Sequence, residues 1–233
     1  MLKKPWPPLL AMLFCAAQFI SVALGVTVVS VLHKAGVSGF RHDVDFGNIL
    51  IATLGFQGMT WILIPVFLRM VNTRVRDAFG LGVWNFLCAL GWAMVVLIAA
   101  LALEYAYELT LQIIGWHPPS QTAVEMLNDA PLWPTGIYLA FFAVVIAPVA
   151  EEFIFRGVLF TFVKNLGFPK IAWIVVSFLF ALVHGDAGIF VPLFFLALLL
   201  TWLYERTENL LAPIIAHALF NAVNLVGLIY QNR

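Results

Sequence analysis

Two adjacent glutamates and an arginine interrupt an apolar stretch, in the sequence APVAEEFIFRG at residues 147–157. An ionisable side chain inside a bilayer costs about 2.5–3.5 kcal/mol on insertion scales, so such residues usually mark functional sites. Glu152 and Arg156 are four residues apart, share one face of a helix and can pair. Glu151 is rotated by about 100° and points to other neighbours. We therefore expect Glu151 to carry the chemistry, and Glu152 with Arg156 to order the site.

Two histidines and an asparagine place further polar groups in later apolar segments. His184 ends the run WIVVSFLFALVHG, with Phe180 one turn before it. His217 and Asn221 are four residues apart in NLLAPIIAHALFNAVN, so both face one direction. Taken alone, the glutamate and arginine group also fits a structural ion network, and a lone histidine also fits an interhelical hydrogen bond. Together, a glutamate base, two imidazoles and an amide can activate a water and stabilise an oxyanion, as amide hydrolysis requires.

The same side chains also admit a metal centre. Two histidines and one glutamate bind zinc with one coordination position open, and here the ligands would be His184, His217 and Glu151. The chain has no HExxH sequence, which argues against a zincin-type site. The residue pattern leaves a metal-free site and a zinc site both open. A GVSG string at residues 36–39 matches the GxSG of rhomboid-type serine proteases, but it lies in a polar loop, and we interpret it as a turn.

The composition is that of a multi-pass membrane protein. Of the 233 residues, 63% are hydrophobic and only 10% are charged, whereas a soluble domain has about 25% charged residues. The formal net charge is zero, which indicates no nucleic-acid partner. We predict a single all-α membrane domain over residues 1–233. Its N-terminal helices and a polar loop occupy 1–133, and its catalytic helices occupy 134–230.

The apolar runs predict a bundle of about seven to eight transmembrane helices, since a span needs about 20 apolar residues. Pro148 predicts a kink just before the glutamates. The polar loop at about 115–133 is expected to contain a short capped helix at 120–127. The predicted helices cover residues 9–32, 47–71, 84–112, 134–164, 170–186, 188–205 and 208–230.

Cationic residues in the short loops predict the orientation of the bundle. If the N-terminus lies inside, most of the loop lysines and arginines fall on the inner side, among them Arg69, Arg74, Lys164 and Arg206. This favours an integral membrane protein with a cytoplasmic N-terminus.

Three motifs in residues 134–230 resemble those of a known family. Glu151-Glu152-Phe-Ile-Phe-Arg156, Phe180-Ala-Leu-Val-His184 and His217-Ala-Leu-Phe-Asn221 are similar to the EExxxR, FxxxH and HxxxN motifs of the CPBP family. That family contains the type II CAAX prenyl endopeptidases and their bacterial relatives, also called Abi proteins. The motifs occur in the family's order, whereas the N-terminal half resembles the family only in being apolar and helical.

The resemblance implies a membrane-embedded endopeptidase, with the bilayer and a peptide or protein substrate as partners. The substrate would be a prenylated CaaX protein or a bacterial peptide, and the location a bacterial plasma membrane. Glu151 and His184 would activate the water, and His217 and Asn221 would stabilise the oxyanion. The roles of ordering and supporting the site would fall to Glu152, Arg156 and Phe180. This assignment needs no cofactor, with Zn²⁺ as the alternative.

Two other functions remain open from the sequence. The chain could be a non-catalytic membrane binding or immunity protein, or an ion-coupled transporter, because buried Glu and His also carry protons. A repeat-built transporter tends to have broken helices in matching halves, and no such pair appears. Replacement of Glu151 by alanine separates the classes, since a protease loses its function while a binding protein mostly keeps it.

Overall fold

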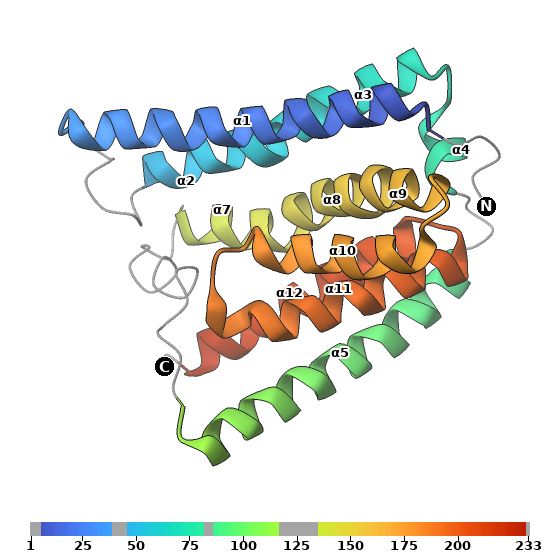
Figure 1. The fold of residues 1–233 in the computed structure, drawn as a ribbon. Coiled ribbons are helices and arrows are strands. Elements are labelled where there is room, and N and C mark those ends of the chain that lie inside the picture. The colour runs from blue at the N-terminus through green and yellow to red at the C-terminus, as the bar shows by residue number, and fades with distance from the viewer. Residues whose placement is uncertain (1–5, 39–45, 82–85, 117–134, 232–233) are drawn as a thin grey trace.

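The computed structural model describes residues 6–38, 46–81, 86–116 and 135–231, which form helices joined by turns (Figure 1). No β-strand occurs within these ranges. The prediction of an all-α helical bundle is confirmed. The short surface helix expected at 120–127 lies outside the described residues.

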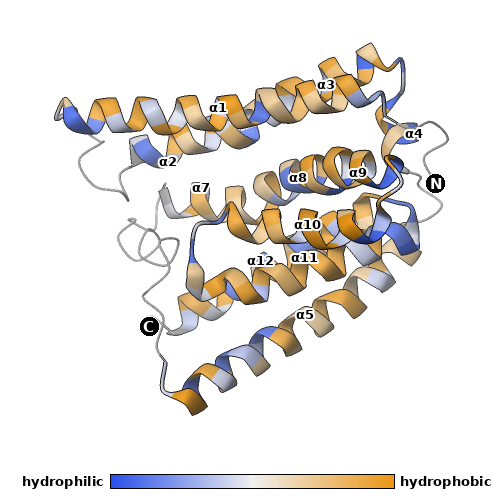
Figure 2. Ribbon diagram, in the orientation of Figure 1, coloured by the Kyte–Doolittle hydropathy of each residue, from blue (hydrophilic) through white to orange (hydrophobic). Residues whose placement is uncertain are grey.

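Six helical stretches in the described ranges are long and apolar enough to cross a membrane, and Figure 2 shows hydrophobic residues along most of their length. They are Pro8–Lys34, Leu50–Met70, Phe86–Ile114, Gly136–Asn165, Ala187–Thr207 and Leu211–Tyr230. The predicted span at 170–186 needs correction. Helix α10 (Pro169–Leu182) has 14 residues, about 21 Å in length, which is shorter than the hydrocarbon core. Gly185, at φ 69°, turns the chain before the next helix.

The N-terminal helices form one layer at the edge of the molecule (Figure 1). In this layer α1 (Pro8–Lys34) packs against a helical run made of α2 (Phe46–Thr53), the π-helical segment η1 (Leu54–Gly58) and α3 (Met59–Met70). The two backbones come close at Gly55, where an added Cβ would lie 3.3 Å from the carbonyl oxygen of Ser21. Small residues allow this approach in membrane helices.

Three of the long helices and the shorter α10 pack against one another on the opposite side of the molecule (Figure 1). They are α5 (Phe86–Ile114), α10, α11 (Ala187–Thr207) and α12 (Leu211–Gln231). Between them and the N-terminal layer runs a broken helix that carries the glutamates. It consists of α7 (Thr135–Phe141), η3 (Phe142–Ile146), α8 (Ala147–Glu152), η4 (Phe153–Phe160) and α9 (Thr161–Asn165). The kink predicted at Pro148 stays a prediction, and the π-helical segment η3 directly precedes α8, whose second residue is Pro148.

The short helix α4 (Val75–Phe79) fastens the N-terminal layer to the turn between α11 and α12. The amide of Leu210 donates to the carbonyl of Phe79 at 2.9 Å. Gly80 has φ 66°, and an added Cβ would lie only 1.9 Å from the carbonyl oxygen of Glu208. Glycine is therefore required at this position, both because of the backbone conformation and because another segment of the same chain lies so close.

Candidate active site

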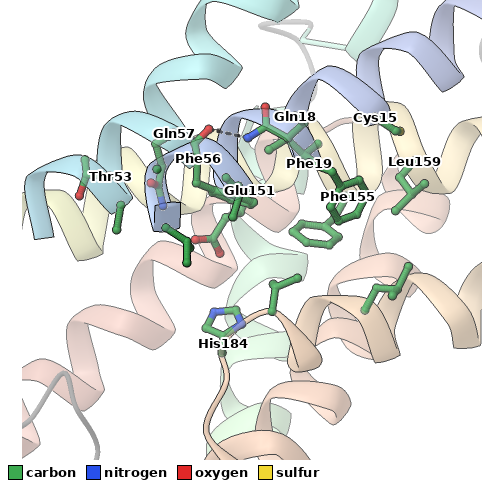
Figure 3. Close-up of a pocket in the computed structure, with 18 of the residues that line it drawn as sticks. Cys15, Gln18, Phe19, Thr53, Phe56, Gln57, Glu151, Phe155, Leu159 and His184 are labelled. Carbon is green, nitrogen blue, oxygen red and sulfur yellow. Dashed lines mark hydrogen bonds between the residues drawn. The ribbon is translucent and has the colours of Figure 1, made fainter. Parts of the chain in front are cut away.

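A cavity of about 570 Å³ lies between the N-terminal layer and the glutamate-bearing helix. Its walls are mostly apolar and come from α1, α2, η1, the broken helix and α10. Glu151 and His184 both line it, and Figure 3 shows the Glu151 carboxylate on the side of the cavity that faces the His184 ring. The first two motifs therefore meet at one cavity, as expected of a site.

Three π-helical segments occur in the described chain, and each adjoins this region. Segment η1 contributes Gln57 to the cavity wall, η3 precedes the glutamates, and η4 follows them directly. A π-turn adds a residue to the helical repeat and is often found at functional sites, because it redirects the side chains beyond it.

Glu152 and Arg156 form a fully buried ion pair. Nη1 of Arg156 donates to Oε1 of Glu152 at 2.7 Å, and both side chains have zero exposure. The guanidinium also donates to the carbonyl of Ala197 at 2.9 Å and reaches the hydroxyl of Thr201 at 3.4 Å. A buried ion pair is tolerated when further hydrogen bonds compensate its lost hydration. The predicted pairing is confirmed, and it also ties the first motif to α11.

His217 lies between the two glutamates. Its Nδ1 lies 2.9 Å from Oε1 of Glu152, and its Nε2 lies 3.8 Å from Oε2 of Glu151. Because a carboxylate only accepts, Nδ1 carries the hydrogen of this bond. The imidazole is 2% exposed, so its orientation is set by protein contacts.

His184 is oriented by its own helix. Its Nδ1 lies 2.7 Å from the carbonyl oxygen of Phe180, so Nδ1 carries a hydrogen and donates it. In the neutral ring, Nε2 is then an acceptor. His184 follows the end of α10, where its imidazole reaches the cavity.

Phe180, the aromatic residue of the second motif, lies at the centre of the site's ring contacts. It is completely buried, and Cζ of Arg156 lies 4.7 Å from its centroid, a cation–π contact. The rings of His217 and His184 lie 5.5 and 4.9 Å from it. Phe180 thus contacts residues from all three motifs.

Asn221 has a partner that the sequence did not predict. Its Nδ2 donates to the carbonyl oxygen of Ala143 in η3 at 2.9 Å. The third motif therefore reaches the broken helix at two places, with His217 at Glu152 and Asn221 at Ala143. The oxyanion role of Asn221 stays a prediction.

The zinc alternative needs three ligand side chains close together. In the described ranges, no three His, Cys, Asp or Glu side chains are grouped closely enough to hold a metal ion. His184, His217 and Glu151 are all described, so they do not form a metal-binding group in this conformation.

Gln57 is a site residue that the sequence analysis missed. It lines the cavity, and its side chain lies close enough to interact with the carboxylate of Glu151. The available signal was a lone amide within the apolar sequence ATLGFQGMTW. Nothing local in that sequence connects it to a glutamate in the other half of the chain.

The comparisons with known proteins bear on the same region. The family model of type II CAAX prenyl endopeptidase Rce1-like proteins matches residues 132–223, which include all three motifs. The UPF0177 protein YxdF of Lactococcus lactis is 30% identical over 140 residues, a match that covers 58% of this chain and 73% of that protein. The chain belongs to the CPBP family.

Two further relatives agree with this assignment to the CPBP family. The membrane-embedded CAAX protease MroQ of Staphylococcus aureus is 30% identical over 138 residues, covering 56% of this chain and 54% of MroQ. The UPF0177 protein YaiF of L. lactis is 28% identical over 156 residues, covering 61% of this chain and 67% of YaiF. No solved structure matches the chain significantly. At the level of the family, this CPBP member is a multi-pass membrane protease.

Proposed function

We propose that this CPBP-family protein is an intramembrane endopeptidase in which Glu151 activates the attacking water without a metal ion. The observation that carries the proposal is that the two glutamates have different surroundings. Glu152 is committed to Arg156 and His217, while Glu151 lines an apolar cavity large enough for a peptide segment. A carboxylate in such a setting can act as a general base.

In the proposed reaction, Glu151 carries one proton from the attacking water to the leaving amine. Glu151 takes one proton from a water molecule, and the hydroxide attacks the carbonyl carbon of the substrate peptide bond. Nε2 of neutral His184 accepts a hydrogen bond from that water and orients it. When the tetrahedral intermediate collapses, the C–N bond breaks and protonated Glu151 returns its proton to the leaving amine.

His217 is proposed to stabilise the oxyanion of that intermediate, whereas Asn221, whose Nδ2 donates to the carbonyl of Ala143, is not given this role. Since Nδ1 of His217 donates to Glu152, a second donation from Nε2 to the oxyanion needs a doubly protonated ring. Preorganised donors of this kind supply about 10²–10³-fold in rate. Glu152 and Arg156 would serve this step by holding the imidazole in place.

The proposed substrate is a membrane-associated peptide, either a prenylated CaaX protein or an unprenylated bacterial peptide. The apolar cavity walls suit a lipidated or hydrophobic segment, and MroQ, a relative, is named a CAAX protease. The proposed location is a bacterial plasma membrane with a cytoplasmic N-terminus, as the cationic loop residues favour.

Cleavage of quenched fluorescent peptides by the protein purified in detergent tests the proposal. One peptide carries a farnesylated cysteine and its twin does not. The variants are Glu151→Gln and, as a matched control, Glu104→Gln, which alters a half-buried glutamate of α5 that does not line the cavity. A zinc chelator is added in parallel.

We expect wild-type and Glu104→Gln protein to cleave a peptide, Glu151→Gln to stay folded but inactive, and the chelator to have no effect. Activity lost to the chelator and restored by zinc would replace the metal-free mechanism by one with His184 and His217 as ligands. Full activity of Glu151→Gln would remove Glu151 as the base. If wild type cleaves neither peptide but still acts in cells after the Glu151 change, a binding or immunity role replaces the protease.

A further inference from the structure

The backbone ladder of the broken helix is interrupted just before the glutamates. In η3 the amide of Ala147 donates to the carbonyl of Phe142, five residues earlier, which is the π pattern. The next donor in that ladder would be residue 148, and its acceptor would be the carbonyl of Ala143. Residue 148 is proline, which has no N–H. Ala143 therefore receives no helical hydrogen bond from that position.

Asn221 supplies the missing donor from another helix. Its Nδ2 lies 2.9 Å from the Ala143 oxygen, across 78 positions of sequence. Ala143 is exposed at the protein surface within Gly136–Asn165, a stretch long and apolar enough to cross a membrane. A carbonyl that faces hydrocarbon without a partner is costly. The amide of Asn221 on α12 thus donates to the carbonyl that Pro148 leaves without a backbone donor.

Side chains also donate to carbonyls of the other two π-helical segments. In η1, Nε2 of Gln18 donates to the carbonyl of Phe56 at 2.7 Å. In η4, the hydroxyl of Thr161 donates to the carbonyl of Arg156 at 2.9 Å, and the indole of Trp6 donates to the carbonyl of Gly157 at 2.9 Å. Each of the three described π-helical segments therefore has a carbonyl that accepts from a side chain, and in η3 that side chain is Asn221.

We infer that Asn221 is a positioning residue, whose amide replaces the backbone donor that Pro148 lacks and holds the glutamate-bearing helix in register with α12. Two bonds join these elements, one on each side of Pro148. Asn221 binds Ala143 before the proline, and His217 binds Glu152 after it. Loss of the first bond frees the helix to shift against α12, and that shift changes the approach of His217 to both glutamates. The catalytic consequence rests on the proposed peptidase function.

Pro148→Ala provides a direct test, because it restores the N–H that Asn221 replaces. Wild type, Pro148→Ala, Asn221→Ala and the double variant are compared in peptide cleavage and thermal unfolding in detergent. With Pro148 present, Asn221→Ala should lower kcat about tenfold or more with little change in KM. It should also lower the melting temperature by about 2–4 °C. In the Pro148→Ala background, both losses should largely disappear, a non-additivity that marks coupled residues.

The matched control is Asn224→Ala, which removes the same kind of side chain one turn further along α12. Asn224 donates to Glu104 at 3.2 Å rather than to the broken helix. Its effect should therefore be the same in the wild-type and Pro148→Ala backgrounds.

Equal losses from Asn221→Ala in both backgrounds would overturn the inference. So would a rescued melting temperature with kcat still lost, since Asn221 would then be needed at the substrate itself. If the wild type cleaves no peptide, the proposed function fails, but the melting temperatures of the four proteins still decide whether Pro148 and Asn221 are coupled.

Discussion

Nδ1 of His217 donates to Oε1 of Glu152 at 2.9 Å, although 65 positions separate the two residues. The same oxygen accepts from Nη1 of Arg156 at 2.7 Å. One carboxylate therefore joins a cation on its own helix to an imidazole on α12. Glu151, its neighbour, is left to face the cavity.

Glu152→Gln is expected to reduce kcat by up to about 10⁴-fold, the loss known for a carboxylate that orients a catalytic imidazole. The neutral amide cannot serve both Arg156 and His217 as the carboxylate does. KM should change little, because Glu152 is fully buried and does not line the cavity. Steady-state kinetics measures both constants. Glu205→Gln, in a partly exposed pair with Lys164, is the control and should change kcat less than about twofold. An unchanged kcat in Glu152→Gln would contradict the orienting role.

Arg156→Ala is expected to cost about 3–5 kcal/mol of stability, because it strands a buried carboxylate. Lys164→Ala removes a cation from a pair whose side chains are 31% and 33% exposed. That change should cost about 0–1 kcal/mol. Thermal unfolding in detergent compares the two variants. Equal shifts in melting temperature would mean that the buried Glu152–Arg156 pair stabilises the fold no more than the partly exposed pair does.

Gln57→Leu is expected to lower kcat/KM by about tenfold while leaving the melting temperature nearly unchanged. The change removes a polar neighbour of Glu151 from the cavity wall without adding much volume. Gln112→Leu, at an exposed position near the end of α5, is the matched control. Identical kinetics for both variants would show that the N-terminal layer contributes only apolar surface to the site.

Gly80→Ala and Gly115→Ala separate backbone strain from steric contact. Both glycines have positive φ, 66° and 69°, a conformation that costs a non-glycine residue about 1–2 kcal/mol. Only at Gly80 would the new Cβ meet another chain segment, at 1.9 Å from the carbonyl oxygen of Glu208, whereas nothing lies within 4 Å at Gly115. Gly80→Ala should therefore lower the melting temperature much further. Comparable melting temperatures would show that α4 is not held against the α11–α12 turn.

Much of the architecture could be predicted because it depends on local chemistry. The long apolar runs predicted helices that agree with the described ones to within a few residues at most ends. The exception is 170–186, where the helix stops at Leu182 and a glycine turn follows, since apolarity continues past the point where the backbone turns. The pairing of Glu152 with Arg156 followed from helical periodicity alone, as both lie on one helix face.

The sequence by itself determined the helical membrane bundle and the motif residues, because both follow from composition and from spacing of a few residues. Only the tertiary structure decided which nitrogen of His217 meets Glu152, that Gln57 faces Glu151, and that Asn221 serves the carbonyl left by Pro148. These contacts join different helices. Helical periodicity says which face a side chain occupies, whereas the register and rotation of packed helices decide which side chain it meets.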